Sequence, residues 1–325
     1  MADAERPPLA TLGWRGDFQP TDPPVARLRA TLEAEAGLGR RDVLDAVDPQ
    51  AENFAERAAE LFHRDGFVLI KDCLDAERLE RLRSGCDEVI RQVVATDPQR
   101  RGNRGSHRYS FAGAAVQFGC VDRWACTVDC PPVLAALTEI WGNRNFSCSG
   151  IGGDFVLPGA VEYQELHADG GLMWQLEGGA TIDSRDMPPL LICVCFPMVL
   201  SPHSPDGHTA INGATRFIRG TATSHDPIPS LAQESREMML STVAPVPAGW
   251  ALIRDVRCWC VVCMSIIPGK HSLFGGPSVS FYAFFGMSAL GTVAHRMLAP
   301  MFGRFQLARF GLHGIRPALA LHTVS

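Results

Sequence analysis

The chain has 325 residues, of which 46% are hydrophobic and 20% are charged. A chain of this length and composition can bury a substantial core, which excludes a wholly disordered protein. The formal net charge of −5 provides no basic field for a polyanion, so we expect a small-molecule partner and no nucleic acid.

Helices and a strand are predicted near the start of the chain. Apolar residues repeat at helical spacing over 51–63, Gly66 ends this helix, and 67–70 is a short apolar strand. Asp75 is a candidate N-cap for a second helix that runs to about Val94. The order helix, strand, helix is therefore expected here.

The second half of the chain has a different pattern, in which short apolar runs alternate with Gly, Pro, Asn and Asp. This pattern predicts an antiparallel β-sandwich or barrel. The uncharged stretch 272–294 has the length of a membrane span but contains Pro277 and four glycines, so we expect buried strand structure and no membrane span. The apolar runs lie at 155–157, 190–196, 215–218, 250–256 and 279–285.

The N-terminus and the cysteines bear on the cellular location. Residues 1–20 are charged and interrupted by proline, whereas a secretory signal needs an apolar stretch of about 7 to 15 residues. We therefore expect a cytoplasmic protein. The 11 cysteines are an odd number, and Cys260 and Cys263 form a CxxC spacing without a second such pair. Reduced core cysteines are thus favoured over a disulfide framework or a four-cysteine zinc site.

One motif suggests metal chemistry. Residues 167–169 read His-Ala-Asp in a region of predicted short strands. Residues i and i+2 of a strand project to the same face, so His167 and Asp169 can offer a nitrogen and an oxygen to one ion. The same spacing occurs in His63 and Asp65. That pair lies where a predicted helix ends, and we interpret it as structural.

Further segments, in a fixed order, complete a resemblance. The stretch 63–74 runs from helix to strand, 212–221 reads Asn-Gly-Ala-Thr-Arg-Phe-Ile-Arg-Gly-Thr, and 247–259 is a turn entering a strand that ends in Trp259. Together with 167–169, they resemble the phytanoyl-CoA dioxygenase family of non-haem iron, 2-oxoglutarate-dependent oxygenases.

The resemblance implies a fold and a set of cofactors. The expected fold is α+β with a β-rich core, a double-stranded β-helix (jelly roll, cupin-like) with flanking N-terminal helices. We expect an N-terminal extension over 1–50 and a single domain over 51–325 that becomes atypical after residue 259. The implied cofactors are Fe(II), 2-oxoglutarate as co-substrate and O2, and the implied reaction is hydroxylation of a small or lipid-like substrate.

In the family, the His-x-Asp motif supplies two iron ligands, which correspond here to His167 and Asp169. A histidine after the tryptophan supplies the third, but Trp259 is followed by Cys260. Cys260 is one substitute for the third ligand, although a thiolate is softer and prone to oxidation. His271, in a predicted loop, is the alternative, and His225, which follows the Asn-Gly strand, is a further histidine that could substitute.

Other residues have candidate roles around such an iron. Gln164 is expected to hydrogen-bond near the co-substrate, and Trp174 to line the substrate entrance. The family's basic residue that binds the co-substrate carboxylate has no counterpart shortly after Cys260, so Arg254 and Arg257 are the fallback partners. Arg254 and Arg257 are an odd number of residues apart, so only one of them can face inward from a strand. Arg254 is an even number of residues from Cys260 and is therefore expected on the same face, which makes it the preferred partner.

The composition changes where the resemblance departs from the family. Residues 256–325 contain no Asp or Glu and six Lys or Arg, whereas about 7.5 acidic residues are expected in a span of that length. A retained intron or shifted reading frame is one explanation, and genuine divergence is the other. The alternative function is therefore a catalytically impaired family member that acts as a binding protein. The sequence identifies neither the substrate nor the oligomeric state.

Overall fold

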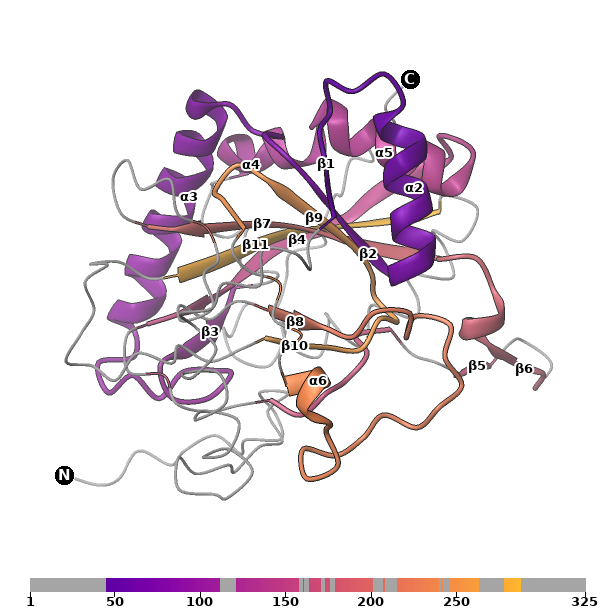
Figure 1. The fold of residues 1–325 in the computed structure, drawn as a ribbon. Helices are drawn as coiled ribbons and strands as arrows, with labels where there is room; N and C mark the ends of the chain where they lie inside the picture. Colours follow the sequence, from indigo (N-terminus) through magenta and orange to yellow (C-terminus); the bar gives the residue numbers. More distant parts are fainter. Residues whose placement is uncertain are drawn as a thin grey trace.

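The computed structural model describes residues 45–111, 121–157, 160, 164–170, 173–175, 179–200, 207, 215–239, 241, 243, 246–262 and 278–287. A seven-stranded major sheet with the order β1-β2-β9-β7-β11-β4-β3 dominates this part (Figure 1). Strands β1 and β2 are parallel, and the other neighbouring pairs are antiparallel. In sheet order, the strands are β1 (Ala46–Val47), β2 (Phe67–Ile70), β9 (Ala251–Asp255), β7 (Leu191–Val199), β11 (Ser278–Met287), β4 (Phe146–Val156) and β3 (Arg108–Ser110).

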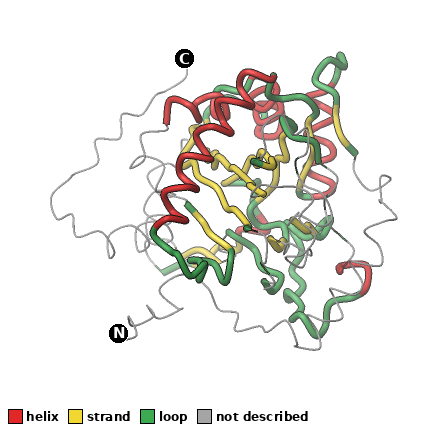
Figure 2. The backbone as a smooth tube through the Cα atoms, turned by 90° about the vertical axis from the view of Figure 1, so that its left-hand side faces the viewer, coloured by secondary structure: helices red, strands yellow, loops and turns green. Residues whose placement is uncertain are grey.

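The four longer helices lie on one side of the major sheet, and loops, short strands and a short helix lie on the other (Figures 1 and 2). The main core cluster joins these helices to the side chains of alternate strand residues such as Ala251 and Ile253. The intervening Leu252 belongs to a second cluster on the opposite face, as the two-residue period of a strand requires. The helices are α2 (Phe54–Asp65), α3 (Ala76–Ala95), α4 (Val121–Val128) and α5 (Pro131–Trp141).

The predicted helix-strand-helix order near the start is present, and local sequence explains its boundaries. Helix α2 ends at Gly66, whose φ of 84° is left-handed and whose N–H donates to the carbonyl of Phe62. Glycine adopts this conformation without the steric cost of a Cβ atom. Helix α3 begins after Asp75, whose side chain accepts a hydrogen bond from the N–H of Arg78, the usual N-cap interaction.

A second, smaller layer lies under the major sheet (Figure 1). Here β8 (Thr215–Phe217) pairs antiparallel with β10 (Cys260–Val262). The second core cluster fills the space between the layers and includes Phe67, Cys195, Phe217 and Leu252. The remaining short elements are β5 (Met173–Gln175), β6 (Thr181–Asp183), the 3-10 helix η3 (Ser184–Asp186) and α6 (Arg236–Met239).

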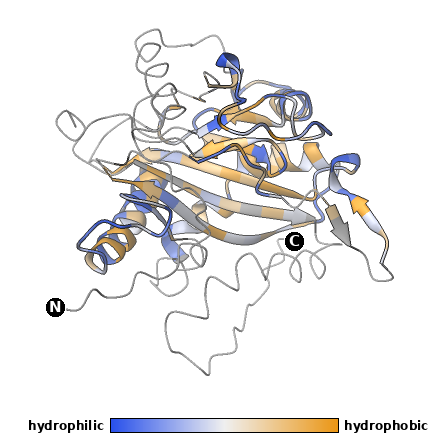
Figure 3. Cartoon of the chain, turned by 90° about the horizontal axis from the view of Figure 1, so that it is seen from below, coloured by the Kyte–Doolittle hydropathy of each residue, from blue (hydrophilic) through white to orange (hydrophobic). Residues whose placement is uncertain are grey.

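The hydropathy of the strands agrees with this layering, because apolar residues follow the strands of the major sheet (Figure 3). Strand β11 lies within the uncharged stretch 272–294 and pairs with β4 on one side and β7 on the other. Within the described residues, no helix has the length and apolar character needed to cross a membrane. The described architecture is therefore a β-rich α+β arrangement with sheets in two layers.

Candidate metal centre

His167 and Cys260 face each other across an isolated antiparallel bridge. The N–H of Cys260 donates to the carbonyl of His167 at 2.8 Å, and the N–H of His167 donates to the carbonyl of Cys260 at 3.2 Å. Directly opposed residues of an antiparallel pair project to the same side. The bridge therefore brings the thiol of Cys260 to the imidazole of His167.

Asp169 completes a group of three donors. One ligand atom from each of His167, Asp169 and Cys260 lies within 4.8 Å of the other two. Nε2 of His167 is 3.3 Å from Oδ1 of Asp169. The three donors are a nitrogen, a carboxylate oxygen and a sulfur, all of which bind divalent transition metals.

The backbone fixes which nitrogen of His167 faces the site. Nδ1 lies 2.9 Å from the carbonyl oxygen of Glu165. Because a carbonyl oxygen only accepts hydrogen bonds, Nδ1 carries the hydrogen and Nε2 is directed at Asp169. Burial opposes a charge on the imidazole, but the hydrogen bond and charge of Asp169 outweigh burial and raise the pKa of His167. A proton is therefore favoured at Nε2 in the metal-free protein, and a metal ion bound there would have to displace it.

Gly170 allows Asp169 to lie this close to the end of β9. The N–H of Gly170 donates to the carbonyl of Val256 at 3.0 Å. A Cβ atom on Gly170 would lie 2.8 Å from Cγ2 of Val256, closer than packed carbon atoms approach. The glycine therefore permits the contact between the Asp169 segment and the major sheet.

Arg254 reaches the same site from β9. Its side chain is buried and donates from Nη2 to Oδ2 of Asp169. Its Nη1 is 3.7 Å from Sγ of Cys260, and its guanidinium lies 5.6 Å from the ring centre of Phe217. Burial opposes the charge on Asp169, but Arg254 and His167 hold the pKa of its carboxyl group far below the usual value.

The other sequence-predicted residues lie elsewhere or outside the described residues. Gln164 has a buried Oε1 atom without a hydrogen-bond partner within the described part of the chain. Arg257 points away from the site and binds Asp255 and the carbonyls of two further residues, Ser184 and Met187. Trp174 lies in β5 opposite Ile182, but its side chain is not described, and His271 lies outside the described residues.

Sequence reasoning missed two thiols near the site. Cys193 lies opposite Arg254 in the register of β7 and β9, and its sulfur is 3.6 Å from that of Cys195. The signal was present as a Cys-Val-Cys alternation in an apolar run, which places both side chains on one face of the strand. The cysteines described by the structure form no disulfide with one another.

A second potential ligand group lies at the surface and consists of Asp183, Asp186 and His225. Arg185 binds Asp183 through a side-chain ion pair of 2.5 Å, and His225 contacts Asp186 at 2.9 Å. The first pair is largely buried and the second is exposed, and ion pairs between protein side chains need no bound metal. These contacts account for the cluster without a metal.

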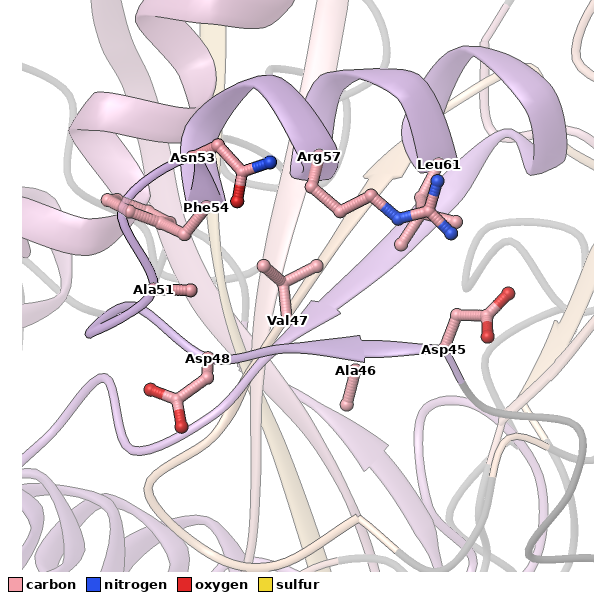
Figure 4. A pocket seen from close by; sticks show the side chains of 9 residues that line it. All are labelled: Asp45, Ala46, Val47, Asp48, Ala51, Asn53, Phe54, Arg57 and Leu61. Carbon is pink, nitrogen blue, oxygen red and sulfur yellow. The ribbon is translucent and has the colours of Figure 1, made fainter.

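Two cavities in the described part lie away from the candidate centre. One of about 400 Å³ lies between β1 and α2 (Figure 4). The other has a volume of about 590 Å³, and its lining includes Phe62, Trp141, Met187 and Arg257. Neither is lined by His167 or Asp169.

No family model matches the chain, and no curated protein sequence matches it. Several solved structures are similar at low identity. AviO1 from Streptomyces viridochromogenes Tue57 is 14% identical, with a TM-score of 0.44 over 73% of this chain and 96% of AviO1. HygX from Streptomyces hygroscopicus, with nickel and 2-oxoglutarate bound, is 13% identical, with a TM-score of 0.47 over 71% of this chain and 86% of HygX. The non-heme alpha ketoglutarate dependent epimerase SnoN from nogalamycin biosynthesis is 17% identical, with a TM-score of 0.47 over 71% of this chain and 82% of SnoN.

Proposed function

We propose that this protein is an Fe(II)- and 2-oxoglutarate-dependent oxygenase that acts on a small molecule. The observation that carries the proposal is the convergence of His167, Asp169 and Cys260, whose donor atoms lie within 4.8 Å of one another. Three protein ligands on one side of an iron ion leave positions for a bidentate 2-oxo acid and oxygen. The bound iron would couple decarboxylation of 2-oxoglutarate to oxidation of a substrate carbon by O2.

Each ligand has a defined task. His167 presents Nε2, because the carbonyl of Glu165 holds Nδ1. Asp169 presents Oδ1, because Arg254 holds Oδ2. Cys260 is the proposed third ligand, and burial raises the pKa of its thiol well above the usual value. A coordinated thiol is deprotonated, so metal binding requires this thiol to release its proton.

The positions for co-substrate and substrate belong to the same proposal. Gln164 is the candidate hydrogen-bonding residue for 2-oxoglutarate, whose oxygens would accept from its amide N–H groups; the buried Oε1 of the same amide has no hydrogen-bond partner within the described residues. Trp174 is the candidate residue at the substrate entrance, and His271 is the alternative third ligand. Arg257 stays a candidate for the co-substrate carboxylate, and binding it would require Arg257 to give up contacts with Asp255 or with backbone carbonyls.

A second candidate function is a metal-free binding protein derived from an oxygenase. The observation that favours it is the ion pair between Arg254 and Asp169, in which the cation already neutralises the carboxylate. In this alternative, the guanidinium of Arg254 holds Asp169 in place, as a metal ion would otherwise do, and Cys260 remains a buried thiol.

Succinate formation separates the two functions. The full-length protein is incubated with Fe(II), ascorbate, O2 and 2-oxoglutarate, and succinate is measured, because uncoupled turnover needs no identified substrate. We expect succinate from the wild type and from Asp186→Ala, which removes an exposed carboxylate of the surface cluster, but none from Asp169→Ala. Wild-type succinate no higher than that of Asp169→Ala would exclude the oxygenase and favour the binding protein.

A further inference from the structure

Arg254 lies at the boundary between the two layers. It belongs to β9, in the major sheet, and is paired with Phe67 on one side and Cys193 on the other. Only 7% of the residue is exposed. Its neighbours in sequence, Ile253 and Asp255, project to the opposite face of the strand. The guanidinium is therefore a buried cation that points from the major sheet toward the smaller layer.

The contacts of this cation converge on the candidate ligands. Nη2 binds Oδ2 of Asp169, and Nη1 approaches Sγ of Cys260 at 3.7 Å. The aromatic ring of Phe217 covers the guanidinium at 5.6 Å and limits its movement.

We infer that Arg254 is the positioning residue of the metal centre and orients Asp169 and Cys260 rather than binding the co-substrate. This inference rests on the proposed function and specifies how the same site is built. The sequence predicted that Arg254 binds the carboxylate of the co-substrate. We infer instead that its partner is the carboxylate of Asp169, a proposed metal ligand.

The geometry gives Arg254 two effects on the ligands. A carboxylate with one oxygen held has a fixed plane, so Oδ1 of Asp169 remains directed toward Nε2 of His167, 3.3 Å away. The positive charge also offsets the negative charge that accumulates when the partly exposed carboxylate of Asp169 and a buried thiolate share one site. Groups that hold a metal ligand in this way typically change metal affinity 10- to 100-fold.

The same contacts leave Arg254 poorly placed for 2-oxoglutarate. Bidentate binding of a carboxylate uses two parallel N–H groups of one guanidinium. Here both terminal nitrogens already face Asp169 and Cys260, and Phe217 covers a face of the group. A co-substrate carboxylate would have to displace a metal ligand in order to bind Arg254.

Cobalt(II) is the probe that tests this role, because a bound thiolate gives Co(II) a charge-transfer absorption band. We expect wild-type protein to bind Co(II) with this band. In Arg254→Gln, Co(II) affinity should fall about 10- to 100-fold and the band should weaken, whereas Arg254→Lys, which retains the charge, should recover part of the affinity. Once Co(II) is saturating, the affinity for 2-oxoglutarate should be the same in all three proteins.

Arg216→Gln is the matched control, because Arg216 is also a buried arginine and binds Glu234 at 2.8 Å. It should lose stability but keep the Co(II) affinity. Unchanged Co(II) affinity with weaker 2-oxoglutarate binding in Arg254→Lys would overturn the inference, even if Arg254→Gln fails to fold. A wild type that binds no Co(II) would overturn it too. A wild type that binds Co(II) but forms no succinate would refute the oxygenase and leave the positioning role standing.

Discussion

His167 and Cys260 exchange both of their backbone hydrogen bonds across the bridge, although one lies in a loop and the other begins β10. The bridge places an imidazole opposite a thiol and makes the side chain at position 260 a direct neighbour of the His-x-Asp motif. The identity of this one residue therefore controls the chemistry of the proposed third ligand.

Replacement of the thiol tests that ligand. In Cys260→Ser, we expect Co(II) to bind more weakly and without the thiolate absorption band, because a hydroxyl is a poor substitute for a thiolate ligand. The measurement is a spectroscopic Co(II) titration. Cys148→Ser is the control, since this half-buried thiol contacts the carbonyl of Gly150 away from the site. A full-strength band in Cys260→Ser would show that another sulfur binds the metal.

Gly170→Ala tests the close approach between the Asp169 segment and β9. The added Cβ would meet Cγ2 of Val256 at 2.8 Å, so the segment must shift and metal affinity should fall. Gly150→Ala is the control, because nothing lies within 4 Å of its added Cβ. Val256→Ala combined with Gly170→Ala should restore Co(II) binding. If the single Gly170→Ala variant binds Co(II) normally, the site does not depend on this contact.

The ion pair between Arg254 and Asp169 should be visible in the free energy of unfolding of metal-free protein. Asp169→Leu leaves a buried guanidinium without its carboxylate, and we expect a loss of about 3 kcal/mol. The double variant Asp169→Leu with Arg254→Met removes both charges and should recover most of that loss. Denaturant unfolding of the wild type, both single variants and the double variant gives the coupling. Strict additivity would contradict a direct ion pair.

A hydrogen-bonded carboxylate outside the candidate metal centre should make the free energy of unfolding depend on pH. Burial opposes the charge on Asp97, but the N–H of Gly102 and the hydroxyl of Tyr109 donate to it and lower its pKa. The contribution of Asp97 to the free energy of unfolding is therefore complete above the unfolded-state pKa of about 3.9. This contribution is lost as the pH falls through the lower pKa of the folded state. The difference in unfolding free energy between wild type and Asp97→Asn should shrink from pH 6 to pH 3. A constant difference would contradict this role.

Local patterns predicted much of the fold. The left-handed cap at Gly66, the N-cap Asp75 and the apolar strands depend on neighbouring residues, and the structure contains them. The helices α4 and α5 were not anticipated, nor was the pairing of β11 between β4 and β7. Strand pairing depends on residues distant in sequence, which periodicity does not specify.

In the candidate site, too, local sequence predicts some features, and contacts between residues distant in sequence decide the others. His167 and Asp169 are two residues apart, so the local sequence alone predicts that they share a face of a strand. The partners of Arg254 and Arg257 depend on the register of β7 with β9 and on the bridge between His167 and Cys260, neither of which can be read from local sequence. The alternation of side chains along the strand predicts only that the two arginines point to opposite faces. The structure directs Arg254 toward Asp169 and Arg257 toward Asp255.

The acid-free composition after Asp255 has a partial physical explanation in β11. Val279, Phe281, Ala283 and Phe285 are each at most 1% exposed and belong to the main core. On the buried face of a strand with neighbours on both edges, a carboxylate without a hydrogen-bonding or charged partner is costly. Ser278–Met287 is thus suited to the centre of the sheet.

The position of β11 also decides what a shortened chain would retain. It is the strand that joins β7 to β4, so a protein that stops at Val262 keeps every described candidate ligand yet leaves the sheet as two unconnected pieces, β1-β2-β9-β7 and β4-β3. The new edges of β7 and β4 would expose unpaired backbone groups along apolar strands, which are templates for intermolecular association. Aggregation of such a fragment would therefore reflect an opened sheet rather than a damaged metal centre.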